Sequence, residues 1–310
     1  MKGVIRITGR CLASDAQAVQ YCVAGQALVC QEAMDGLAAY AVGFTSLQAA
    51  DLPVKFAEPE IMTMANSTCC YRGKAYFDSK FRDVQYWRED MRGQLDIDGV
   101  PMCQIDFSEL YIHVLNAEPL GIGLNLELIT GPALVLLLSL GSTYCMHAGA
   151  VDTAAGCIGI VAESGAGKST LSQHVDDDWR QISDDIMPLQ ISNSGSMIEV
   201  LADFPQLKLS GNRVRHSDNT RKKLDYLLRI NPVPGDSINF SVLPRVQAML
   251  QIVRHTVAAK LFDTRALGQH AGFANKVSTL VPVIEVSYPR DLDKLDQLRE
   301  TIVDYLISNT

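Results

Sequence analysis

The sequence of 310 residues has little of what several protein classes require. Its 27 Lys and Arg residues are outnumbered by 35 Asp and Glu residues, and the formal net charge is −8. This balance argues against nucleic acid as the main partner, because a phosphate backbone requires a basic face. None of the eight cysteines lies in a Cys-x-x-Cys pair, so a zinc site is not expected and the cysteine usage fits a reducing cytosol. We therefore expect a cytoplasmic protein with no nucleic-acid partner.

Long hydrophobic runs are also missing. The stretch from Leu128 to Met146 carries no charge, but Gly131-Pro132 and Gly141 bracket its apolar block. The uninterrupted part would form a helix of about eight to twelve residues, which is too short to cross a bilayer and fits a buried core helix. The first residues do not have the pattern of a secretory signal. We expect no membrane association.

Two parts of the chain differ in character. Residues 1–118 are strand-rich, with an Asp98-Gly99 turn that predicts a hairpin, and residues 119–310 alternate strands and helices. In the second part we expect two strands, at 144–152 and 157–161, joined by a short turn. Helices are expected at 168–177, 243–261 and 291–306, and strands at 180–183 and 281–288. The fold class is therefore α/β, with a larger α/β domain preceded by a smaller strand-rich domain.

A phosphate-binding loop is the strongest motif. An apolar strand leads into a glycine-containing loop and then a helix, with the order Ala162-Glu163-Ser164-Gly165-Ala166-Gly167-Lys168-Ser169-Thr170. In such Walker A loops the backbone N–H groups surround a phosphate chain, the lysine reaches the β- and γ-phosphates, and the hydroxyl after it ligates Mg²⁺. The full pattern has Gly where Ala162 stands. The loop predicts a nucleotide site that holds ATP and Mg²⁺.

Acidic residues and one histidine accompany the loop. Asp184 and Asp185 follow the strand expected at 180–183, and one of them could join Ser169 as a metal ligand, although a turn or helix cap is the alternative. Glu163 lies inside the loop, where it either accepts the proton of an acceptor hydroxyl or points to solvent. His147 is either a core histidine or a member of the catalytic site.

These residues together resemble the HPr kinase/phosphorylase family. The resemblance rests on Ser183-Asp184-Asp185, on the loop from Ala162 to Ser169, and on Met146-His147-Ala148-Gly149-Ala150-Val151-Asp152. It implies a P-loop kinase domain akin to phosphoenolpyruvate carboxykinase and transfer of phosphate from ATP to a serine hydroxyl. By this resemblance Glu163 stands where the family has its catalytic Asp, His147 supports that acid, and Asp184 and Asp185 are associated with the metal. Relatives often assemble, so a homo-oligomer is among the expected states.

Some features depart from that family. Glu163 and Ala162 replace Asp and Gly, and the family's later glycine-rich loop is not recognisable. The segment Phe204-Pro205-Gln206-Leu207-Lys208-Leu209 instead resembles HPr-kinase-like proteins of lasso-peptide and other modified-peptide gene clusters. The expected substrate is therefore a serine-containing peptide or protein such as a ribosomal precursor peptide. Two alternatives stay open: a kinase of small-molecule hydroxyls, and a nucleotide-gated regulatory ATPase without a kinase substrate.

Overall fold

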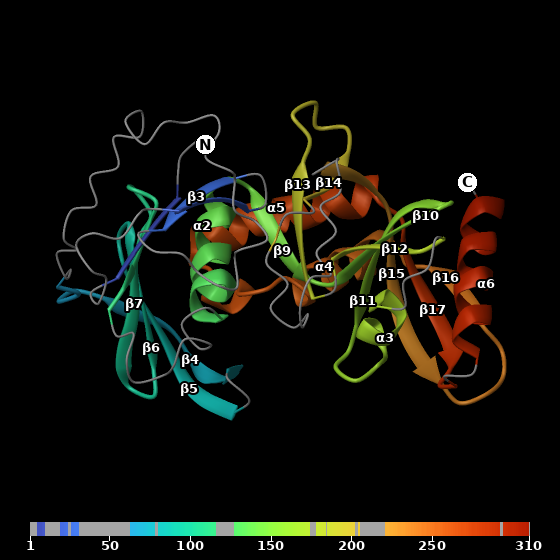
Figure 1. Ribbon diagram of the computed structural model, residues 1–310, viewed down its shortest axis with the longest axis horizontal. Coiled ribbons are helices and arrows are strands. Elements are labelled where there is room, and N and C mark those ends of the chain that lie inside the picture. Colours follow the sequence, from blue (N-terminus) through green and yellow to red (C-terminus); the bar gives the residue numbers. More distant parts are fainter. Residues whose placement is uncertain are drawn as a thin grey trace. The chain divides into compact units, whose positions relative to one another are not determined.

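The computed structural model describes residues 5–9, 19–23, 26–30, 63–77, 80–115, 127–173, 178–183, 185–201, 204, 221–291 and 294–309 (Figure 1). The chain forms two compact units, one of residues 1–141 with 258–266 and one of residues 142–257 with 267–310. The first unit extends past residue 118, where the domain boundary was expected, because the helix before Gly141 belongs to it.

The first unit is built on an eight-stranded sheet with the order β2-β3-β1-β8-β7-β6-β5-β4. Its strands are β1 (Ile5–Gly9), β2 (Val19–Val23), β3 (Gln26–Cys30), β4 (Thr68–Phe77), β5 (Lys80–Glu89), β6 (Arg92–Ile97), β7 (Val100–Asp106) and β8 (Tyr111–Val114). The strands from β4 to β8 form an antiparallel meander, and β1 pairs in parallel with β3 and β8. The predicted hairpin at Asp98-Gly99 is confirmed, since both residues adopt the positive φ that a tight two-residue turn requires.

The apolar block of the first unit is a short buried helix. A π-helical turn, η2 (Ile129–Ala133), precedes α2 (Leu134–Leu140), and the residues of α2 from Leu134 to Ser139 are all buried. Pro132 lies in the turn and Gly141 caps the helix, which explains its length of 7 residues. Within the described residues, no helix is long and apolar enough to cross a membrane.

The second unit contains a nine-stranded mixed sheet. Its strands are β9 (Thr143–His147), β10 (Gly149–Thr153), β11 (Gly156–Ala162), β12 (Arg180–Ser183), β13 (Ile186–Ile191), β14 (Ile198–Leu201), β15 (Arg221–Val233), β16 (Asn239–Val242) and β17 (Val283–Pro289). The principal order is β12-β10-β11-β15-β14-β13-β9, and β17 pairs with β15 and β16. β15 pairs in parallel with β11 on one side and with β17 on the other.

Helices complete the second unit. They are α3 (Lys168–Gln173), α4 (Arg245–Arg254), α5 (Thr264–Leu280), of which the residues from Leu267 on belong to this unit, and α6 (Leu295–Ser308). The short 3-10 helix η3 (Ala259–Leu261) belongs to the first unit. One hydrophobic core joins residues of the strands β10, β11, β15 and β17 with residues of α3 and α6. The apolar face predicted for the last helix is confirmed, since Leu298, Ile302 and Leu306 are buried in that core.

Two predictions for the second unit need correction. The strand expected at 144–152 is two strands divided at Ala148, because β9 pairs with β13 whereas β10 forms the predicted hairpin with β11. β10 also pairs with β12, the strand expected at 180–183. The helix expected at 243–261 ends at Arg254, because the chain then pairs with β9: Thr256 bridges Met146 and the Val257 N–H donates to the Cys145 carbonyl at 2.8 Å.

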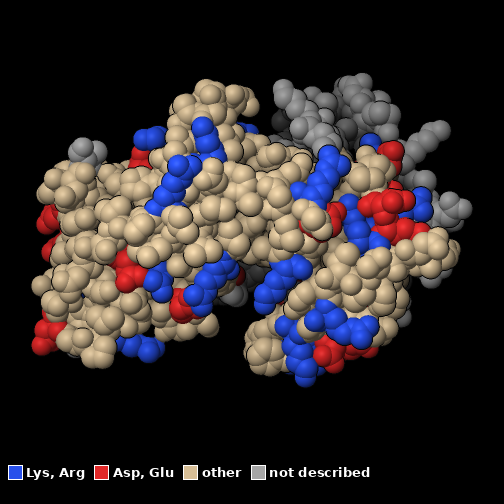
Figure 2. Space-filling model, turned by 180° about the vertical axis from the view of Figure 1, so that it is seen from behind, with Lys and Arg blue, Asp and Glu red and all other residues tan. Residues whose placement is uncertain are grey.

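Charge of both signs is spread over the surface. Figure 2 shows acidic and basic side chains interspersed on the face that it presents. Ion pairs link strands of the sheet, as when Asp152 of β10 accepts from Arg180 of the adjacent β12 at 2.8 Å and from Lys222 of β15, beyond β11, at 3.0 Å. The free cysteines Cys145 and Cys157 are buried, and burial raises the pKa of Cys157 to about 12.

Candidate active site

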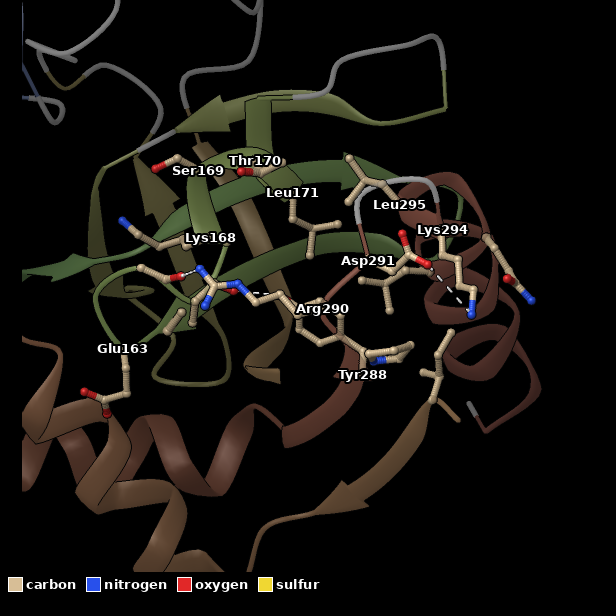
Figure 3. A pocket seen from close by; sticks show the side chains of 18 of the residues that line it. Glu163, Lys168, Ser169, Thr170, Leu171, Tyr288, Arg290, Asp291, Lys294 and Leu295 are labelled. Carbon is tan, nitrogen blue, oxygen red and sulfur yellow. Dashed lines mark hydrogen bonds and ion pairs between the residues drawn. The ribbon is translucent and has the colours of Figure 1, made fainter. Parts of the chain in front are cut away.

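The candidate site lies where parallel strands of the second unit end. β11, β15 and β17 run in the same direction, so the segments after Ala162, Val233 and Pro289 meet at one edge of the sheet. Ligands of α/β proteins bind at the carboxyl ends of parallel strands. A cavity of about 740 Å³ opens here and is large enough for a nucleotide. Its walls include His147, the loop from Ala162 to Leu171, Asp185, Asp236, Ile238, the segment from Tyr288 to Asp291, and the start of α6 (Figure 3).

The predicted phosphate loop is a tight turn between β11 and α3. Gly165 and Gly167 have φ values of 78° and 92°, which side-chain-bearing residues rarely adopt. The backbone N–H of Ala166 donates to the Glu163 carbonyl at 3.1 Å, and Leu171 donates to Gly167 at 2.9 Å as the helix begins. The loop residues Ser164, Gly165, Ala166, Gly167, Lys168, Ser169 and Thr170 all line the cavity. The strand–loop–helix arrangement predicted from the sequence is therefore present.

Lys168 lies at the base of the loop and contacts the acid that follows β12. It is buried, with 7% of its surface exposed. Its Nζ lies 3.3 Å from Asp185 Oδ1, and the same oxygen lies 3.4 Å from His147 Nδ1. The break between β9 and β10 creates this proximity, because the Ala148 N–H after His147 donates to the Asp185 carbonyl at 3.1 Å. The sequence-predicted residues Lys168, His147 and Asp185 are thus neighbours.

Glu163 has a different partner. Its carboxylate lies 3.0 Å from the guanidinium of Arg254, the last residue of α4, and both side chains are more than half exposed. The resemblance implies that His147 supports Glu163; in the structure its Nδ1 lies 3.4 Å from Asp185 Oδ1. Glu163 points toward α4, and Figure 3 shows it apart from Lys168 and Ser169. Arg254 was missed by the sequence reasoning, and only its place near the end of an amphipathic helix could have drawn attention to it.

A second histidine lies behind this ion pair. His255 is buried beside Glu163, Arg254 and His147, and its backbone carbonyl accepts from the His147 N–H at 2.7 Å. Burial lowers the pKa of His255 and outweighs the opposing effect of Glu163. The imidazole is therefore neutral at physiological pH.

Oxygen ligands suited to Mg²⁺ are present, although they are few. Within the described part of the chain, no three His, Cys, Asp or Glu side chains gather to hold a metal ion, and the predicted ligand Asp184 lies outside it. Ser169 and Asp185 both line the cavity. Mg²⁺ in nucleotide sites commonly takes one or two protein oxygens and completes its shell with phosphate oxygens and water. This pair of oxygen ligands fits that mode of binding. It is too small to surround a metal ion with protein ligands alone.

Comparisons with known proteins add little to this geometry. No protein-family model matches the sequence, and no curated protein matches it. Among solved structures, the HPr(Ser) kinase/phosphatase from Coxiella burnetii aligns with 54% of this chain and 99% of its own, at 11% sequence identity and a TM-score of 0.29.

Proposed function

We propose that the protein is an ATP- and Mg²⁺-dependent kinase that transfers the γ-phosphate to a serine hydroxyl of a peptide or protein. One observation carries the proposal: a glycine-containing loop at the end of β11 places the buried Lys168 beside Asp185 in a nucleotide-sized cavity. Phosphoryl transfer depends on positioning the phosphates and neutralising their charge, and this arrangement provides both.

Each residue of the site has a distinct part in the proposal. The loop N–H groups and Lys168 hold the phosphate chain, and Ser169 and Asp185 bind the metal, joined by the predicted ligand Asp184. Mg²⁺, when bound, neutralises charge on the transferred phosphate. Glu163 takes the proton of the acceptor hydroxyl, and its exposure leaves it able to turn from Arg254 toward a bound substrate.

Asp185 is a second candidate for the general base. It is held between Lys168 and His147, so a proton that it accepts could be shared with the imidazole. Lys168 opposes this role, because a neighbouring cation favours the ionised carboxylate and makes it a weaker base. Glu163 has its own cationic neighbour, Arg254, but that pair is solvent-exposed and its influence is reduced.

Transfer of label from γ-labelled ATP tests the kinase activity. Purified protein is incubated with cell lysate, and the labelled products are resolved by mass. We expect an acid-stable and alkali-labile label on a peptide or protein, and we expect Lys168→Ala to abolish it because the phosphates lose their cation. Lys260→Ala, which removes an exposed lysine of the first unit, is the matched control and should retain wild-type transfer. Label on a small metabolite would instead identify a small-molecule kinase.

Two charge-removing variants distinguish the candidate bases. Glu163→Gln should retain ATP binding and lose about 10²- to 10⁴-fold in transfer, the range that a general base contributes. Glu300→Gln on the exposed face of α6 is its control, and Asp304→Asn is the control for Asp185→Asn. Normal transfer by Glu163→Gln would exclude Glu163 as the base. Free phosphate as the only labelled product, formed equally by wild type and Glu163→Gln, would indicate a regulatory ATPase.

A further inference from the structure

Two side chains at the end of β17 contact the phosphate loop. The Tyr288 hydroxyl donates to the Ala166 carbonyl at 2.6 Å, across 122 residues of sequence. The Arg290 guanidinium donates to the Gly165 carbonyl at 3.0 Å, across 125 residues. Figure 3 shows both side chains reaching toward the loop from the strand that ends beside it. Neither residue forms part of the sequence motif.

The carbonyl oxygens of Gly165 and Ala166 would weaken anion binding if they faced the bound anion. A carbonyl oxygen that faces a phosphate repels it, whereas an N–H attracts it. In a trans peptide the C=O of one residue and the N–H of the next point in opposite directions. The bond from Tyr288 to the Ala166 carbonyl therefore turns the Gly167 N–H away from the tyrosine. Arg290 fixes the preceding peptide, whose Ala166 N–H donates to the Glu163 carbonyl, and offsets the charge of the Gly165 carbonyl with a cation.

The Tyr288 contact is close, and Tyr288 is held in place by strand pairing. A side chain at Gly167 would place its Cβ 3.0 Å from the Tyr288 hydroxyl, so a glycine is needed both for this approach and for its φ of 92°. Tyr288 is paired with Pro232 in the parallel ladder between β15 and β17, and β15 in turn pairs with β11. Burial raises the pKa of Tyr288, so its hydroxyl stays protonated and able to donate.

We propose that Tyr288 and Arg290 are positioning residues that hold the loop's carbonyls away from the ligand and thereby preorganise it for a triphosphate chain. The inference rests on the proposed nucleotide site. It assigns to β17 a contribution to phosphate affinity that the loop motif alone does not contain. Contacts that fix these peptides reduce the conformational freedom that ligand binding would otherwise have to remove.

The test measures affinity for Mg²⁺-ATP and for inorganic triphosphate by calorimetry. Tyr288→Phe removes only the hydroxyl. It should lower the affinity for both ligands by the same factor, about fivefold, as expected for one lost hydrogen bond. Arg290→Ala should also lower the affinity for both ligands, and Arg290→Lys should retain part of the affinity that Arg290→Ala loses. Tyr305→Phe on α6 and the exposed Arg265→Ala are matched controls and should bind like wild type.

A second measurement reports on the loop without any ligand. Amide hydrogen exchange at residues 165–167 should be faster in Tyr288→Phe and Arg290→Ala than in wild type, and unchanged in Tyr305→Phe. Wild-type triphosphate affinity and loop exchange in Tyr288→Phe would overturn the proposal. A loss for ATP with triphosphate binding unchanged would also overturn it, because Tyr288 would then contact the nucleoside. Wild-type protein that binds neither ligand would refute the nucleotide site itself.

Discussion

Two acids of the candidate site, Glu163 and Asp185, have contrasting surroundings. Asp185 shares one oxygen with Lys168 and His147 and is largely enclosed, whereas Glu163 forms an exposed pair with Arg254. Exposed pairs between long side chains contribute little stability, so Glu163 can change partners at small cost. Asp185 is therefore the fixed acid of the site and Glu163 the movable one.

A buried histidine gives the second unit a dependence on pH. His270 is 1% exposed, its Nε2 lies 2.8 Å from the Thr256 hydroxyl, and burial lowers its pKa. An unfolded histidine titrates near pH 6.5, so below that pH the unfolded chain binds a proton that the folded chain resists. The unfolding free energy of the second unit should therefore fall as the pH drops from about 7.5 to about 5. Urea unfolding followed by Trp179 fluorescence measures this.

The control for that prediction removes one titrating group. His270→Gln keeps a polar partner for Thr256 and should show a shallower fall in the unfolding free energy over the same pH range. Part of the pH dependence of the unfolding free energy should remain, because the pKa of His255 is lowered by burial as well. An identical pH dependence in wild type and His270→Gln would show that His270 does not contribute.

Individual elements show what could be predicted from the sequence. The hairpin before the loop, the loop itself and the last helix follow from local signals, namely alternation, glycine placement and helical spacing. In α4 the apolar spacing does not identify the buried face, since Val246 and Leu250 are exposed while Ala248 and Ile252 are buried. The helical spacing of apolar residues identifies an apolar face, but tertiary packing decides whether that face is buried.

Other features depend on contacts between distant segments, which a single sequence does not reveal. The helix α5 was not predicted, and neither was the pairing of β15 with strands on both sides. The neighbours of Asp185 depend on the break at Ala148, which aligns His147 with Ile186 in the ladder between β9 and β13. The contacts of Tyr288 and Arg290 with the loop depend on that long-range pairing in the same way.

The turn between β10 and β11 should be sensitive to a single methyl group. Gly156 has a φ of 108°, and an added Cβ would lie 2.5 Å from a carboxylate oxygen of Asp225, which accepts the Cys157 N–H. Gly156→Ala should lower the unfolding free energy by about 1–3 kcal/mol, from backbone strain and the displaced carboxylate. Urea unfolding of the purified variant measures the change.

A glycine in open space provides the comparison. Gly272 lies within α5, where an added Cβ meets no atom within 4 Å. Gly272→Ala should raise the unfolding free energy by about 0.4–1 kcal/mol, because alanine restricts the unfolded chain and favours the helix. Equal effects of the two substitutions would contradict the strain assigned to Gly156.

At the scale of the whole molecule, each compact unit contains one of the two tryptophans. Trp87 lies in the first unit, where its indole N–H donates to Asp96 at 2.8 Å, and Trp179 lies in the core of the second. Single-tryptophan variants, Trp179→Phe and Trp87→Phe, therefore report on one unit each. Every described residue that lines the candidate cavity belongs to the second unit.

Ligand binding should consequently stabilise the units unequally. At roughly 100 times its dissociation constant, Mg²⁺-ATP should add about 2.7 kcal/mol to the unit that binds it. The unfolding midpoint reported by Trp179 should rise with nucleotide, and the midpoint reported by Trp87 should stay constant. Equal shifts of both probes would mean that the units unfold together, and no shift at Trp179 would contradict nucleotide binding.

The distance in sequence between the phosphate loop and its supports has a consequence for biosynthesis. A nascent chain that has just presented Ala166 must be extended by 122 residues before Tyr288 can reach it. Until then β15 also lacks β17, and the apolar residues of the shared core lack the cover of α6. The phosphate loop is therefore synthesised well before β17 and α6. A ribosome that paused between them would hold a chain whose core strands are exposed. Such a chain is a natural client for chaperones that shield apolar segments during synthesis.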